Sequence, residues 1–203
     1  MVLFRPVGLE ELRLIYEAGM RTFPPRLPEQ PIFYPVLNVG YARQIAFEWN
    51  TKSGTLGGFV TRFGVDDDYV ARFGRKVVGA PMHEELWVPA EELEEFNRHL
   101  EGPIEVIEAY FGEGYQGVVP DSGSFEGKDA HAQFVALASD GHADLEAELA
   151  ANHVAVFLDY FFWQQRSFSG DGITDADRDA FLAKLAAVWD RSPAAVAPLG
   201  VRA

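Results

Sequence analysis

Apolar residues recur along the first 111 residues at two different spacings. Alternating apolar positions are typical of strands, and apolar positions three or four residues apart are typical of helices. Strands are predicted at 2–7, 32–34, 58–63, 76–79, 85–88 and 104–111. Helices are predicted at 9–18, 41–49 and 90–100. A further short helix is predicted to begin at the three aspartates 66–68. These elements predict an α+β fold.

Two local patterns interrupt this series. The segment 23–36 holds five prolines in fourteen residues, which excludes a helix or a central strand and predicts an ordered, extended loop. In the last strand the apolar alternation of Ile104 and Val106 slips before it resumes at Ala109 and Phe111.

The pattern changes after Gly112. Residues 113–128 are rich in glycine, serine and acidic residues, and they predict a linker or irregular loop. Helices follow at 130–138, 143–165 and 174–191, and the middle one is apolar on several sides, which indicates burial. We therefore expect an α+β domain at 1–112 and, at 113–203, a linker and helical C-terminal extension packed on it.

Composition narrows the possible functions. The absence of cysteine among 203 residues excludes a disulfide framework, a thiolate metal site and a cysteine nucleophile. A net charge of −14 repels phosphate backbones and disfavours a nucleic-acid partner. Neither a signal-peptide pattern nor an apolar run of about 20 residues is present, so we expect a cytoplasmic protein without a membrane partner.

Three candidate features follow one another in the chain. Arg5 lies on the first predicted strand, Tyr34 and Tyr41 belong to an aromatic element in the second segment, and the motif HEELWVP carries His83 and Glu85. Side chains two residues apart on a strand share a face, so His83 and Glu85 are expected to point into the same cleft.

This order resembles the ADP-ribosyltransferase fold over residues 2–111. HEELWVP is similar to that family's late-strand motif, with His83 in the first place, although the second element departs from the common Ser-Thr-Ser version. The stretches FPPRLPEQPIFYPVLN, YARQIAFEWNT and HEELWVPAEELEEFN more closely resemble an uncharacterised bacterial family often labelled as ADP-ribosylation related.

The resemblance implies a split β-sheet domain and an enzyme that uses NAD as a substrate. Arg5 would hold NAD, Tyr34 or Tyr41 would stack on nicotinamide, and Glu85 would stabilise the oxocarbenium-like state formed when the nicotinamide–ribose bond breaks. His83 would orient the ribose or the acceptor, which would be a protein or a small molecule.

Each residue also has a purely structural interpretation. Arg5 and Glu85 could be solvated or paired surface charges. Tyr34 and Tyr41 could be core or rim aromatics, and His83 could satisfy a neighbouring group.

Two other charged segments also have both a functional and a structural interpretation. Arg21 and Arg26 in the proline-rich loop could cradle a pyrophosphate or belong to a rigid structural loop. SGDGITDAD lacks calcium-binding character, because Arg178 stands where a bidentate glutamate is needed; it predicts instead a helix capped by Thr174, with Asp177 in the first turn. No metal site is predicted.

Two alternatives to the enzyme remain. One is a catalytically silent domain of the same fold, whose acidic stripe at 84–105 binds a basic protein partner, as an inhibitor or immunity protein would. The other is a structural homologue with an unrelated ligand in the equivalent cleft. Convergence of Arg5, one of the tyrosines and Glu85 on one pocket would favour the enzyme.

Overall fold

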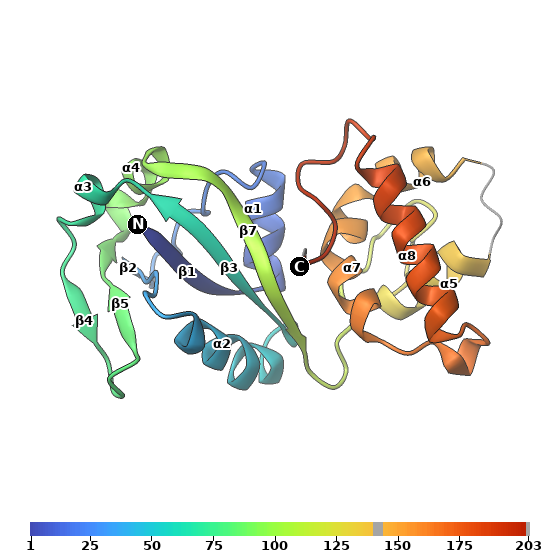
Figure 1. Cartoon of the computed structure of the whole chain (residues 1–203), viewed down its shortest axis with the longest axis horizontal. Coiled ribbons are helices and arrows are strands. Elements are labelled where there is room, and N and C mark those ends of the chain that lie inside the picture. The colour runs from blue at the N-terminus through green and yellow to red at the C-terminus, as the bar shows by residue number, and fades with distance from the viewer. Residues whose placement is uncertain (140–143, 202–203) are drawn as a thin grey trace. The chain divides into compact units, whose positions relative to one another are not determined.

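The computed structural model describes residues 1–139 and 144–201 and divides the chain into two compact units, Met1–Glu113 and Gly114–Ala203 (Figure 1). The first mixes strands and helices, and the second is helical in the described residues. The fold is therefore α+β, as expected. None of the described helices is long and apolar enough to cross a membrane.

An antiparallel sheet of order β1-β3-β7 forms the centre of the first unit. Its strands are β1 (Val2–Gly8), β3 (Gly57–Val65) and β7 (Leu100–Phe111). The pairing of β3 with β7 shifts register between Val60 and Thr61, opposite the point where the apolar alternation of β7 slips. A β-bulge or similar irregularity accounts for that slip.

Two short strand pairs extend this architecture. They join β4 (Arg75–Val77) with β5 (Glu84–Leu86), and β2 (Ile32–Phe33) with β6 (Val88–Pro89). Val36 forms single bridges to Phe4 and to Glu85, so it connects the edge of β1 to β5. The predicted strand at 85–88 is thus two strands with different partners, and the interruption falls at Trp87.

Helices cover both faces of the central sheet. Arg5 contacts α1 (Leu9–Glu17), whereas the adjacent Phe4 packs on the core cluster that includes residues of α2 (Val39–Glu48). Because neighbouring side chains of a strand point to opposite faces, the two helices lie on opposite sides of β1. At Gly58 a Cβ would lie 2.1 Å from the carbonyl oxygen of Ala46, so only glycine permits this approach of α2 to β3.

Capping side chains set several helix boundaries. Asn38 accepts a hydrogen bond from Gly40 and starts α2 two residues earlier than predicted, and Asp66 caps α3 (Asp67–Val70) as expected. The predicted helix at 90–100 is shorter: a 3-10 turn at Ala90–Glu92 precedes α4 (Leu93–Arg98). Leu100 belongs to β7 instead. Another 3-10 turn, Asn50–Lys52, follows α2.

The second unit contains α5 (Ala130–Ser139), α6 (Leu145–Ala151), α7 (His153–Gln165) and α8 (Asp175–Trp189), with a 3-10 turn at Ser169–Asp171. The helix predicted at 143–165 begins outside the described residues and is broken at Asn152, whose side chain bonds the Glu148 carbonyl and the Ser124 hydroxyl. The burial predicted for this helix is confirmed for its second half, α7, whereas Leu149 is the one buried residue of α6 among the described residues. The predicted Thr174 cap of α8 is confirmed, and Asp177 completes a capping box with it.

A buried carboxyl group joins the irregular segment after residue 114 to α7. Asp159 accepts hydrogen bonds from the Tyr115 hydroxyl and the Val118 amide, each at 3.1 Å. Gly117 has a positive φ, and a Cβ there would lie 2.2 Å from Asp159 Oδ1. Burial raises the pKa of Asp159 well above its ordinary value.

This burial predicts a pH-dependent stability of the second unit. Above about pH 4 the unfolded chain loses the Asp159 proton while the folded chain retains it, so the free energy of unfolding falls by up to about 1.4 kcal/mol per pH unit until the raised pKa is reached. Asp159→Asn should remove this contribution. Amide hydrogen exchange of α7 between pH 4.5 and 7.5, corrected for intrinsic rates, measures it, and parallel profiles for the two proteins would refute the prediction.

Candidate functional site

A cleft of about 310 Å³ lies where β1, the segment around Val36, α2 and β5 meet. This volume is at the lower end of the range for ligand pockets, roughly 300–1,000 Å³. The residues that line it are Arg5, Pro6, Tyr34, Val36, Tyr41, Ile45, Trp49, Glu85 and Trp87. Four of the five residues selected from the sequence therefore line one cleft.

Arg5 is buried and fixed in place, with 7% of its surface exposed. Its Nε and Nη2 atoms donate to the Glu11 carboxylate at 2.6 and 3.1 Å, and Nη1 donates to the Tyr34 carbonyl at 3.2 Å. The guanidinium also lies over the Phe33 ring, 4.6 Å from its centroid. Glu11 thus balances the charge of Arg5, and part of the donor set of the guanidinium stays available to a ligand.

Glu85 is equally buried, at 8% exposure, but has no cationic partner. Its Oε1 accepts a hydrogen bond from the Trp87 indole at 2.7 Å. Within the described part of the chain, no lysine or arginine forms an ion pair with it. A carboxylate without an ion-pair partner can bind a positively charged group of a ligand.

Aromatic rings form much of the cleft wall. Tyr34 and Trp87 meet edge to face, with centroids 6.0 Å apart. Trp49 and Trp87 are 55% and 43% exposed, which is unusual for such large apolar side chains. Tyr41 is buried; burial raises the pKa of its hydroxyl, and the nearby negative charge of Glu85 raises it further.

His83 does not line this cleft. It lies in the turn before β5, and its ring stacks on Tyr41 with centroids 4.2 Å apart. Its Nε2 is 2.9 Å from Gln44 Oε1, and its Nδ1 is 3.2 Å from the Val78 carbonyl. The expectation that His83 and Glu85 point into the same cleft is therefore wrong. His83 contacts the cleft indirectly, through the ring of Tyr41.

Comparison with protein-family models, curated proteins and solved structures gave no match to this chain.

The two arginines of the proline-rich loop occupy different places. Arg26 donates to the Ile32 carbonyl at 3.2 Å, and its pKa is lowered first by burial and then by the positive charge of Arg5. Glu11 and Tyr34 act on Arg26 in the opposite direction. Arg26 thus adds a second guanidinium near the Arg5 end of the cleft, whereas Arg21 lines a different pocket.

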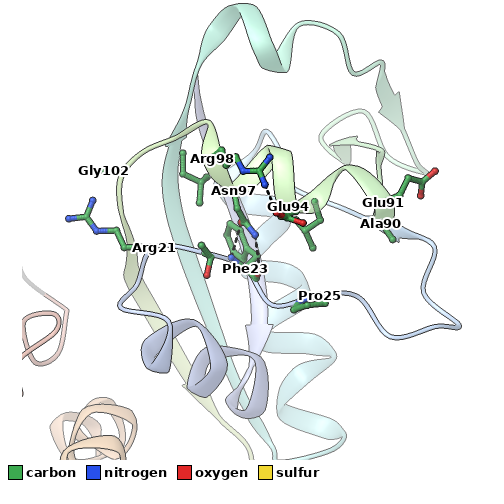
Figure 2. Close-up of a pocket in the computed structure, with 12 residues that line it drawn as sticks. Arg21, Phe23, Pro25, Ala90, Glu91, Glu94, Asn97, Arg98 and Gly102 are labelled. Carbon is green, nitrogen blue, oxygen red and sulfur yellow. Dashed lines mark hydrogen bonds and ion pairs between the residues drawn. The ribbon is translucent and has the colours of Figure 1, made fainter.

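That second pocket is larger, about 970 Å³, and its lining comes from parts of segments 21–25 and 90–98 and from the start of β7 (Figure 2). Three of its polar side chains, those of Glu94, Asn97 and Arg98, already have protein partners. The Asn97 amide bonds both backbone groups of Phe23 at 2.9 Å, and Arg98 pairs with Glu94 and Glu95. The residues selected for catalysis do not line it, so the smaller cleft is the stronger candidate.

The sequence analysis did not select the tryptophans Trp49 and Trp87, which line the cleft, or Glu11, which pairs with Arg5. Trp87 could have been found, since it lies two residues after Glu85 and so on the same side of an extended segment. Trp49 is the C-terminal cap of α2, and no local pattern distinguishes it. Glu11 could not be told apart from Glu10, because both are acidic residues of the first turn of α1.

The Arg5–Glu11 pair predicts a difference between two adjacent glutamates. Glu11→Gln leaves a buried guanidinium without its counter-charge and should lower the free energy of unfolding by about 2–4 kcal/mol. Glu10→Gln removes an exposed ion pair to Arg13 and should cost under about 1 kcal/mol. Urea denaturation of both variants measures the difference, and equal costs would contradict the structural role of this pair.

Proposed function

We propose that the protein is an NAD-dependent ADP-ribosyltransferase-like enzyme, which cleaves the nicotinamide–ribose bond and modifies a protein or small-molecule acceptor. The observation that carries the proposal is the presence of Arg5, Tyr34, Tyr41 and Glu85 around one cleft. A carboxylate, a guanidinium and aromatic rings are the groups that this chemistry needs.

Glu85 takes the central role in this proposal. As the bond breaks, its electron pair goes to the ring nitrogen, so neutral nicotinamide leaves and positive charge develops on the ribose. A buried carboxylate without a cationic partner stabilises that charge, and it can accept a hydrogen bond from a ribose hydroxyl. Trp87 holds one oxygen of Glu85, which leaves the other for the substrate.

The opposite end of the cleft suits the anionic part of NAD. Arg5 lines the cleft, and Arg26 lies within electrostatic range of it. A pyrophosphate there would gain charge-assisted hydrogen bonds and would relieve the mutual repulsion of the two guanidinium groups. The volume of the cleft fits the nicotinamide riboside end, so we expect the adenosine end to lie outside it.

The silent acidic module has weaker support. Several glutamates of the 84–105 stripe are paired with arginines of the same unit: Glu92 with Arg72, Glu94 and Glu95 with Arg98, and Glu105 with Arg62. These pairs reduce the negative charge that the stripe offers to a basic protein partner.

The proposal predicts a selective loss of activity at position 85. Wild-type protein should bind NAD in a calorimeter and release nicotinamide, and Glu85→Gln should slow release by about 100-fold or more because the developing charge loses its stabilising carboxylate. Glu84→Gln, which removes the same charge beside the cleft, is the matched control and should retain activity. Absence of NAD binding at millimolar concentration would refute the proposal.

A second prediction is that Arg26 and Arg21 differ in their effect on NAD binding. Arg26→Gln should weaken NAD binding by about ten-fold, because a charge-assisted contact to the pyrophosphate is lost. Binding of nicotinamide riboside, which has no phosphate group, should stay unchanged. Arg21→Gln, in the other pocket, should change neither. Equal effects of the two substitutions would exclude Arg26 from the site.

A further inference from the structure

The charges around the cleft do not cancel at its aromatic end. The Arg5 guanidinium is balanced by Glu11, and Arg26 lies beyond the residues that line the cleft. Glu85 keeps an oxygen that accepts no hydrogen bond from any described residue and that stays accessible from the cleft, although the residue as a whole is only 8% exposed. An accessible carboxylate oxygen at the wall of the cleft favours a ligand that brings a positive charge.

The rings near Glu85 add to this preference. Tyr34, Tyr41, Trp49 and Trp87 line the same cleft, and the negative faces of aromatic rings attract cations. The structure already uses this interaction next to the site, where the Lys76 ammonium lies 5.8 Å from the centroid of the Trp87 ring. Lys76 stands directly opposite Glu85 in the β4–β5 pair, but it is exposed and no ion pair joins the two side chains.

We propose that this end of the cleft is a recognition site for a planar organic cation, and that it rejects a neutral ring of the same shape. For its biological ligand the inference rests on the proposed function: it selects the oxidised, pyridinium form of the nucleotide over the neutral dihydropyridine form. It also gives a physical reason for product release, since nicotinamide loses its charge when the glycosidic bond breaks.

The test compares small rings that differ in charge. Tryptophan fluorescence or calorimetry follows the binding of 1-methylnicotinamide, which is cationic, and of nicotinamide and 6-methylnicotinamide, which are neutral; the last controls for the added methyl group. The cation should bind at least about ten-fold more tightly to the wild type. Glu85→Gln should remove most of this preference, and Glu84→Gln should retain it.

The outcomes separate this inference from the proposed enzyme. Equal binding of the charged and neutral rings, or no binding of either at tens of millimolar concentration, overturns the cation site even if NAD is cleaved. A preference for the cation that Glu85→Gln abolishes, without any nicotinamide release from NAD, supports the cation site and refutes the transferase. If Glu85→Gln folds poorly, the comparison of charged and neutral rings on the wild-type protein alone decides whether the cleft prefers a cation.

Discussion

The ion pair between Arg5 and Glu11 is the interaction on which the candidate site depends. It joins the central sheet to α1, and the third contact of the guanidinium, to the Tyr34 carbonyl, ties the proline-rich loop to the same point. These bonds hold one wall of the cleft in place. They also satisfy the charge of Arg5 within the protein, whereas Glu85 at the other wall forms no ion pair with a described residue.

The separation of these charges connects the fold to the proposed chemistry. Val36 forms one bridge to Phe4 of β1 and one to Glu85 of β5. It thereby connects the strand that carries Arg5 to the strand that carries Glu85, although the two strands do not pair directly. A ligand with a cationic ring at one end and an anionic group at the other matches the arrangement of carboxylate, rings and guanidinium groups. Oxidised NAD, the proposed substrate, has that distribution of charge.

Local patterns predicted most elements of the fold, but not the points where tertiary contacts override them. The first strand, the first helix and the caps at Asp66 and Thr174 follow from nearby residues. The division of the 85–88 strand does not, because its halves pair with different strands. For the site, a motif identified Glu85, whereas Glu11 and Trp49 reach it only through packing of helices on the sheet.

The most direct test is a crystal structure of Glu85→Gln, which should leave NAD uncleaved, in complex with NAD. The account predicts the nicotinamide ring among Tyr34, Tyr41 and Trp87, its ribose beside position 85, and the pyrophosphate toward Arg5 and Arg26. Nucleotide bound instead in the pocket beside α4, or absent at saturating concentration, would contradict it.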